Sequence, residues 1–253
     1  MRRLHPDPVP VVDGALDDAG LVAAYRLPPG RSLRVNFVAS LDGAITVGGV
    51  SAGLGSPGDK RVFRVLRALA DVVLVGHGTA AAEGYRPIAA GSPVGRLRAS
   101  IGRPPTGPVA VVSRRASLDP RGPLVTDAVS PTILVTCAAT DPARREALAA
   151  AGATVLVCGG DDVDLPLALD RLAELGHPQV LCEGGPQLLR AALVARVVDE
   201  LDLTIAPFLV GGETRLLDDV LPAARRLDLH QLLEEDGTLF ARYGVRDWVP
   251  GAR

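Results

Sequence analysis

From Leu33 onwards the chain repeats one order of segments: a short apolar run, a glycine or serine turn, and often an amphipathic stretch. The first run, 33–39, has Leu, Val, Phe and Ala at alternate positions, which is typical of a strand with one buried face. Strands joined by helices form right-handed crossovers and a mainly parallel sheet, so the repeat indicates an α/β fold. Further strands are predicted at 71–76, 109–113, 132–136, 154–157 and 179–182, and helices at 141–151, 165–175 and 186–196.

A further helix is predicted to begin at Ser56, because a capping serine followed by Pro57 is a common helix start and an apolar stripe follows. Near the end of the chain, 198–209 and 238–248 have strand patterns with no clear helix between them. We therefore expect antiparallel edge strands there. Residues 85–108 are rich in Gly, Pro and Arg and are predicted to be a long surface loop.

The domain organisation follows from where the repeat begins. Residues 1–32 are rich in Pro, Asp and Gly, and we expect an extension with one helix around 17–25. Residues 33–253 have no clean internal boundary and no repeat, so they are predicted to form one domain.

The charge balance excludes two classes of partner. There are 27 Lys and Arg residues against 29 Asp and Glu, a formal net charge of −2. Neither a basic surplus for nucleic acid nor a polybasic block for an anionic membrane is present. No uncharged apolar stretch is long enough to span a bilayer. Lys60, the single lysine, lies in Ser-Pro-Gly-Asp-Lys rather than in a phosphate-binding loop, and its exposed helical setting argues against a Schiff base.

Cysteine usage indicates a reducing compartment. The three cysteines, Cys137, Cys158 and Cys182, each follow an apolar run, and no Cys-x-x-Cys pair occurs. Without a signal peptide, this pattern predicts a cytoplasmic protein with free thiols. The four histidines do not cluster with the cysteines at any ligand spacing, so no metal site is expected.

The chemically informative residues follow the predicted strands, where ligands bind in an open parallel sheet. Ser40-Leu41-Asp42-Gly43 follows the first strand, Gly76-His77-Gly78-Thr79 the second, Ser113-Arg114 the third, and Glu183-Gly184-Gly185-Pro186 the strand at 179–182. Glycine turns leading into helices expose backbone N–H groups that suit a pyrophosphate. A serine hydroxyl beside a guanidinium suits a phosphomonoester, and the 2′-phosphate of NADPH is an obvious candidate.

Each of these features also has a purely structural interpretation. Glycines after strands often only make tight turns, Ser-Arg is often a solvated turn, and Asp42 is compatible with a loop cap. His77 is more simply explained by packing than by proton transfer. The three-glycine fingerprint of dinucleotide-binding domains does not occur on the first strand–helix turn, so a nucleotide would need a different cradle.

Taken in order, four motifs resemble the reductase domain of bacterial riboflavin biosynthesis, which has the dihydrofolate-reductase-like fold. They are Asn36–Gly43, Leu66–Thr79, Glu183–Leu189 and Asp199–Gly212. The resemblance covers about residues 33–248 and implies a three-layer α/β domain, NADPH as cofactor and a homodimer. It implies a reductase in which hydride passes to a phosphoribosylaminopyrimidine of the 5-amino-6-(5-phosphoribosylamino)uracil type.

The resemblance also implies roles for individual residues. NADPH would lie against Ala39, Gly76, Gly78, Thr79, Gly184, Gly185 and Leu188, with its 2′-phosphate on Ser113 and Arg114. Arg67 would hold the substrate phosphate, with Asn36 and Ser40 beside the substrate. Asp42, Glu83 and Glu183 would hold or polarise it. In this fold the paired glycines can carry a cis peptide, so Gly184-Gly185 is a candidate for one.

This chain departs from the family pattern at the substrate pocket. A lysine is usual where Asn36 stands, Asp-x-Pro is usual where Glu83-Gly84-Tyr85 stands, and a tryptophan is replaced by the Ala52-Gly53 region. Losing a cation and an aromatic wall changes what a pocket binds. Two alternatives therefore stay open, reduction of dihydrofolate or another pterin and NADPH binding without catalysis. No histidine is assigned as proton donor.

Overall fold

The computed structural model describes residues 1–6, 16–211, 214–217 and 219–247, and in them ten strands form one sheet. The order is β1-β9-β10-β8-β2-β7-β3-β4-β5-β6. From β8 to β6 neighbouring strands are parallel, whereas β10 is antiparallel to β8 and β9, and β1 is antiparallel to β9. The predicted α/β fold, a mainly parallel sheet with antiparallel C-terminal strands, is confirmed. The strands are β1 (Arg2–His5), β2 (Ser32–Ser40), β3 (Val72–Gly76), β4 (Val109–Val112), β5 (Ile133–Thr136), β6 (Thr154–Val157), β7 (Gln179–Cys182), β8 (Glu200–Ala206), β9 (Arg225–Glu235) and β10 (Thr238–Asp247).

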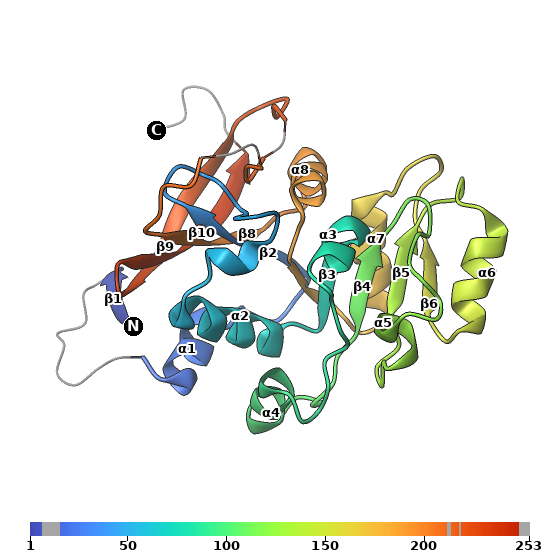
Figure 1. The fold of residues 1–253 in the computed structure, drawn as a ribbon, viewed down its shortest axis with the longest axis horizontal. Helices are drawn as coiled ribbons and strands as arrows, with labels where there is room; N and C mark the ends of the chain where they lie inside the picture. Colours follow the sequence, from blue (N-terminus) through green and yellow to red (C-terminus); the bar gives the residue numbers. More distant parts are fainter. Residues whose placement is uncertain (7–15, 212–213, 218, 248–253) are drawn as a thin grey trace.

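Helices cover both faces of the sheet, so the domain has three layers (Figure 1). Alternate residues of β3 separate the two cores: Leu74 packs in the core that α7 and α8 contribute to, and Val73 in the core of α1 and α2. Both faces of the strand are therefore apolar, as a buried parallel strand requires. The helices are α1 (Asp18–Tyr25), α2 (Pro57–Leu69), α3 (His77–Ala82), α4 (Pro93–Ser100), α5 (Pro123–Thr126), α6 (Pro142–Ala150), α7 (Leu165–Glu174) and α8 (Pro186–Val194), with one 3₁₀ turn at Ser51–Gly53.

The predicted surface loop at 85–108 is wrong in part, because it contains helix α4. Ser92 caps this helix by accepting a hydrogen bond from the Gly95 N–H, and Pro93 occupies its first turn. Arg98 is buried, and its guanidinium donates to the backbone carbonyls of Arg67 and Ala70 at the end of α2. Part of the segment predicted to be a surface loop is thus a helix, which a buried arginine docks on α2 by satisfying the carbonyls at the end of that helix.

Two strands were not predicted. β9 lies between the segments expected to be edge strands and forms a long hairpin with β10. β1 pairs with β9 across most of the sequence, and Leu21 and Tyr25 of α1 are buried against α2. Residues 1–32, expected to be an extension, thus contribute a strand and the expected helix to the same sheet and core. The final residue of the predicted strand at 238–248 lies outside the described residues.

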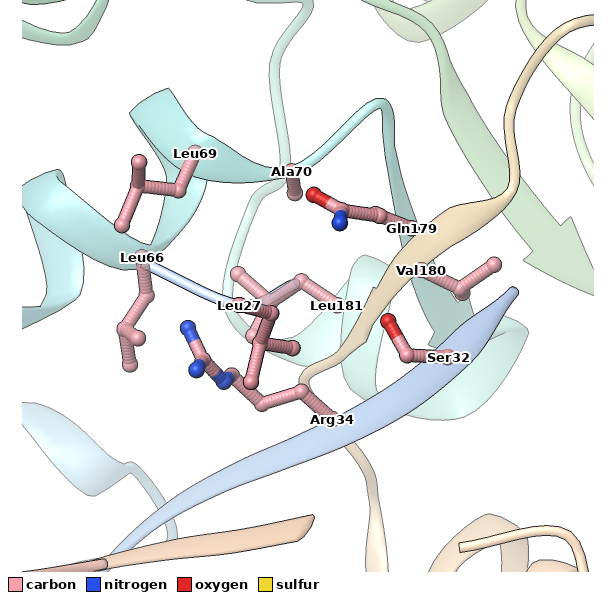
Figure 2. A pocket seen from close by; sticks show the side chains of 9 residues that line it. All are labelled: Leu27, Ser32, Arg34, Leu66, Leu69, Ala70, Gln179, Val180 and Leu181. Atoms are coloured by element: carbon pink, nitrogen blue, oxygen red, sulfur yellow. The ribbon is translucent and has the colours of Figure 1, made fainter. Parts of the chain in front are cut away.

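A buried ionic cluster joins the two halves of the sheet. Arg34 on β2 pairs with Glu200 and, at 3.0 Å, with Asp202 on β8, while Arg242 on β10 donates to Glu200 at 2.6 Å. Figure 2 shows Arg34 beside Leu27 and Leu66 in a cavity of about 20 Å³, room for about one water molecule. This cavity lies where β2 and β7 begin, whereas the ligand clefts described below lie where they end.

The cluster predicts a pH-dependent stability. Burial raises the pKa of Asp202 to about 7, because Arg34 only partly offsets the loss of solvent. The folded protein then binds a proton that the unfolded chain releases, so stability falls as the pH rises from about 4 to about 7. In urea unfolding at several pH values, Asp202→Asn is expected to remove a decline of about 4 kcal/mol in the free energy of unfolding. The exposed control Asp161→Asn should keep the wild-type slope, and an equal slope in Asp202→Asn would contradict the assignment.

Candidate functional site

Two adjoining cavities lie at the carboxyl ends of the parallel strands. The first, which we call the α2 pocket, has a volume of about 670 Å³ and is bordered by β2, α2 and the segment after α3. The second, the α8 cleft, has a volume of about 890 Å³ and runs along the N-terminal part of α8 and the turn after β4. Because the two cavities adjoin, a ligand in one can contact a ligand in the other. Five residues line both cavities: Gly78, Thr79, Gly185, Pro186 and Thr214.

The boundary between the cavities is formed by the turn from β7 to α8. The peptide bond between Gly184 and Gly185 is cis, and the Gly184 carbonyl accepts a hydrogen bond of 2.7 Å from the Gly76 N–H. Gly184 has a φ of +83°, and a Cβ there would lie 2.5 Å from the Phe37 ring. A Cβ on Gly185 would lie 2.5 Å from Thr79 Oγ1. Both positions therefore require glycine, which explains this pair at the strand end.

Glu183 is held at the rim of the α2 pocket by two side chains. Arg67 donates to both of its carboxylate oxygens at 2.7 Å, and the Tyr85 hydroxyl donates to Oε2 at 2.6 Å. Only 2% of the Glu183 side chain is exposed. Burial opposes the charge on Arg67, but Glu183 outweighs it and raises the pKa of the guanidinium. Burial and then the Glu183 charge also raise the pKa of Tyr85, so its hydroxyl remains a donor.

Aromatic rings fix the Arg67 guanidinium in this position. Its central carbon lies 4.3 Å from the centre of the Phe63 ring and 5.1 Å from that of Tyr85. Phe63 and Arg67 are four residues apart on α2, so they share one face of the helix. The guanidinium is therefore oriented by two rings and a bidentate carboxylate, and the Glu183 charge is balanced inside the pocket.

Other expected site residues also border the α2 pocket. Asn36 lies on β2, and Glu83 follows α3. The Glu83 Oε1 atom accepts a hydrogen bond of 2.9 Å from the Ser51 N–H, so Glu83 anchors the 3₁₀ turn. Two exposed cations, Lys60 and Arg86, complete this side of the pocket.

The α8 cleft collects most of the residues expected around a cofactor. Arg114 is exposed beside it, as is the neighbouring Arg115, whereas Ser113 is buried and its Oγ accepts a hydrogen bond of 3.0 Å from the Ser117 N–H. Helix α8 has no side-chain cap at Gly185, so the N–H groups of its first turn are open to a ligand. The expected residues that border this cleft are Gly76, Gly78, Thr79, Ser113, Arg114, Gly185 and Leu188.

Four of the expected residues do not border either cavity: Ala39, Ser40, Asp42 and Gly184. Ala39 and Ser40 are buried at the end of β2. Asp42 accepts hydrogen bonds from the Ser40 hydroxyl and from the Val210 and Gly211 N–H groups, at 2.5, 3.1 and 2.7 Å. The Ser40 hydroxyl and these two amides lower the pKa of Asp42 to about 2. Asp42 therefore connects the loop after β2 to the loop after β8 through hydrogen bonds.

Sequence reasoning missed Tyr85, Phe63 and Arg86 as pocket residues. The α2 residues carried a usable signal, because Lys60, Phe63 and Arg67 recur at helical spacing on one face. Tyr85 carried none, since its contact with Glu183 joins residues 98 positions apart.

The described cysteines and possible metal ligands give little support for thiol or metal chemistry at this site. Cys137, Cys158 and Cys182 are free and buried, and burial raises the pKa of the Cys182 thiol to about 12. Among the described residues no cluster of His, Cys, Asp and Glu could hold a metal ion. In the same part of the chain, no helix combines the length and apolar character needed to cross a membrane.

The sheet order, the glycine turn and the cavities at the strand ends define an α/β protein whose cavities lie at the carboxyl edge of its parallel strands, the edge where ligands bind in open α/β sheets. Residues 31–238 match the model of one family, described as the RibD C-terminal domain, and the chain belongs to this family. The resemblance predicted from the four sequence motifs is thereby confirmed.

Individual relatives agree with this assignment. A curated protein of Methanothermobacter thermautotrophicus, named 2,5-diamino-6-ribosylamino-4(3H)-pyrimidinone 5′-phosphate reductase, is 31% identical over 84% of this chain and 97% of its own length. A solved pyrimidine reductase-like protein of Corynebacterium diphtheriae is 28% identical with a TM-score of 0.73, over 85% of this chain and 92% of that one. Acinetobacter baumannii RibD has the same fold, with a TM-score of 0.69 at 19% identity over 86% of this chain and 59% of that one. The predicted three-layer α/β architecture is shared with these relatives, and reductase relatives support an oxidoreductase.

Proposed function

We propose that the chain is an NADPH-dependent reductase that acts on a phosphoribosylaminopyrimidine of riboflavin biosynthesis. The observation that carries this proposal is the junction of two cavities at Gly78, Thr79 and Gly185. A cofactor in the α8 cleft and a polar substrate in the α2 pocket would meet at this junction. The activity for which the Methanothermobacter relative is named supports the substrate class.

The donor set of the α8 cleft fits a phosphorylated dinucleotide. The uncapped first turn of α8 offers backbone N–H groups to a pyrophosphate, next to the open surface at Gly78, where a Cβ would meet nothing within 4 Å. Arg114 and Arg115 are exposed and form no ion pair within the described ranges, so both can bind a 2′-phosphate. Bound there, reduced NADPH supplies a hydride.

In the α2 pocket the chain positions the substrate. We assign Glu183 as the carboxylate that accepts hydrogen bonds from the polar substrate, with Arg67 and Tyr85 fixing its orientation. Asn36 and Glu83 are assigned to further polar contacts, since both border the same pocket. Ser40 and Asp42 are assigned an indirect role, because they tie the loop after β2 to the loop after β8.

NADPH oxidation measured in parallel with the phosphoribosylaminopyrimidine and with dihydrofolate tests the proposal. We expect turnover on the pyrimidine. Turnover on dihydrofolate alone would indicate that the departures from the family pattern at Asn36 and Glu83 have changed the substrate specificity. Tight NADPH binding without turnover on either compound would instead favour a binding protein without catalysis.

The choice of cofactor is tested at Arg114. Its replacement by alanine removes one charge-assisted contact to the 2′-phosphate, so we expect the Kd for NADPH to rise roughly tenfold to a hundredfold. The Kd for NADH, which lacks that phosphate, should change less than about threefold. Arg121→Ala, at an exposed arginine that lines neither cavity, is the matched control. Equal losses for the two cofactors in titration calorimetry would refute the assignment of Arg114.

We further propose that the chain is a cytoplasmic homodimer. Exposed apolar side chains gather on neighbouring loops after β2 and β8, with Leu41 69% and Leu209 79% exposed. The Leu41 N–H donates to the Phe208 carbonyl at 3.0 Å, so these loops lie together. An apolar group of this kind favours association with a second copy, and light scattering of the purified protein measures its mass.

The three free cysteines support the proposed reducing compartment, the cytoplasm.

A further inference from the structure

The α2 pocket contains an acidic side chain that the proposed function does not use. Asp59 lines this pocket together with Glu83 and Glu183. Both carboxylate oxygens of Glu183 accept hydrogen bonds from Arg67, and Glu83 accepts one from the Ser51 N–H. Asp59 is half-buried and forms no ion pair within the described ranges of the chain. Its carboxylate therefore keeps acceptor capacity for a ligand of the pocket.

Asp59 is held in place by both the helix and the sheet. It lies in the first turn of α2, where its N–H donates a hydrogen bond of 3.1 Å to the capping Ser56 side chain. The Thr204 hydroxyl on β8 donates to the Asp59 carboxylate. Thr204 is buried and pairs in register with Val38 on β2, which also lines the pocket. The position of the carboxylate is thus fixed before any ligand binds.

Burial makes this carboxylate favour a ligand that donates hydrogen bonds. Burial raises the pKa of Asp59, while the Thr204 hydroxyl and the Lys60 charge act in the opposite direction. Water therefore solvates the charge poorly, and a donor on the ligand restores part of the lost solvation. An ionised carboxylate has about four acceptor sites, of which Thr204 occupies one. The sites that remain can accept from two adjacent N–H groups of one ligand.

Asp59 shares one face of α2 with two other residues of the pocket. Asp59, Phe63 and Arg67 recur at intervals of four residues, and all three line the pocket. The rise of the helix places Asp59 about 12 Å from Arg67 along the axis. An extended substrate can therefore lie along this face, with a planar ring beside Asp59 and Phe63 and its sugar chain directed toward Glu183, the partner of Arg67.

Two types of ring are available to a phosphoribosylaminopyrimidine, and they present different groups to a carboxylate. A 2-amino-4-oxo ring has its N3–H beside a 2-amino group, so it offers two adjacent donors. A 2,4-dioxo ring has its N3–H between two carbonyl oxygens, so one oxygen would face an oxygen of the carboxylate. Two acceptors that face each other repel and leave a half-buried charge without its donor. An ionised Asp59 therefore discriminates between the two rings at C2.

We propose that Asp59 selects the substrate by the group at C2 of the pyrimidine, and that the chain reduces the 2-amino-4-oxo compound in preference to the 2,4-dioxo compound. The inference rests on the proposed function and deepens it, because it names the ring that enters the site. The Asp59 carboxylate accepts one hydrogen bond from N3–H and one from the 2-amino group. The preferred ring differs from the uracil-type ring that the sequence resemblance implied.

Steady-state kinetics with the two phosphoribosylaminopyrimidines tests the assignment. For the wild type we expect kcat/KM to be at least about tenfold higher on the 2-amino compound than on the 2,4-dioxo compound. In Asp59→Asn the amide keeps one acceptor and gains a donor, which matches an N3–H beside a carbonyl. We expect this variant to lose roughly a hundredfold in kcat/KM on the 2-amino compound and less than about threefold on the other, so that the preference reverses.

A purely structural role of Asp59 predicts a different result. Loss of a contact that only supports the fold would lower kcat/KM for both compounds by the same factor. That outcome would overturn the proposal, as would a wild type that does not prefer the 2-amino ring. Asp161→Asn, at an exposed aspartate that lines neither cavity, is the matched control and should keep the wild-type preference.

A binding measurement separates this inference from the proposed function. The probes are 2,6-diaminopyrimidin-4-one and 6-aminouracil, two free rings that differ in the group at C2 and require no turnover. In thermal unfolding of the full chain we expect the diamino ring to raise the Tm of the wild type and of Asp161→Asn more than 6-aminouracil does, and the order to reverse in Asp59→Asn. This order without turnover on either substrate would refute the proposed function alone. Equal shifts with both rings in the wild type and in Asp59→Asn, zero shifts included, would refute the assignment of Asp59 alone.

Discussion

Replacement of Glu183 by glutamine is expected to lower kcat/KM at least about a hundredfold and to destabilise the fold by about 3 kcal/mol. Glutamine keeps the shape of the side chain but removes the charge that Arg67 and Tyr85 bind at 2.7 and 2.6 Å. The Arg67 guanidinium then stays between its two rings without a counter-charge, in a pocket where solvent compensates poorly.

Two companion variants separate the charge from the packing. Tyr85→Phe removes one hydrogen bond and keeps the ring over Arg67, so a loss of about tenfold in kcat/KM is expected. Glu174→Gln breaks an exposed pair with Arg171 and should leave both kcat/KM and the urea midpoint near the wild-type values. Wild-type kcat/KM in Glu183→Gln would show that the carboxylate charge has no part in the reaction.

Gly184→Ala is expected to lower the free energy of unfolding by about 3–5 kcal/mol. Its φ of +83° costs a residue with a Cβ about 1–2 kcal/mol. The Cβ would also overlap the Phe37 ring at 2.5 Å, and the buried strand β2 leaves that ring little room to move. Urea unfolding of the purified variant measures the loss.

Other substitutions divide this loss into its two causes. Adding Phe37→Leu to Gly184→Ala should recover the part due to overlap and leave the part due to φ. Gly78→Ala is the matched control, because a Cβ there meets nothing within 4 Å and the residue lies within α3. Its stability should stay within about 1 kcal/mol of wild type. A Gly184→Ala protein as stable as Gly78→Ala would contradict the geometry of the β7–α8 turn.

The parts of the fold that could be predicted are those with strong local periodicity. The buried parallel strands and α2 were recognised because their apolar residues recur at the period of the element. The Glu183-Gly184-Gly185 turn was recognised from glycines at a strand end. These features depend on residues that are close together in the chain, so they can be predicted from a single sequence.

The parts that could not be predicted depend on distant partners. Helix α4 lies in a stretch rich in Gly, Pro and Arg, and its buried Arg98 is satisfied by carbonyls about thirty residues earlier in the chain. Strand β9 is largely polar, because much of it faces outward near the edge of the sheet. Arg67 and Glu183 are 116 residues apart, and only the fold reveals that the two charges neutralise each other.

Transfer of deuterium from the cofactor to the substrate is the most direct test of the proposed reaction. NADPH carrying deuterium at both hydrogens of nicotinamide C4 is incubated with the wild-type protein and the phosphoribosylaminopyrimidine, and the product is analysed by mass spectrometry. We expect a ribityl product one mass unit heavier than the product formed with unlabelled NADPH, with the label on C1′, the sugar carbon bonded to the pyrimidine amine. A product without the label, or no product beside unchanged pyrimidine, would contradict hydride transfer by this protein to that substrate.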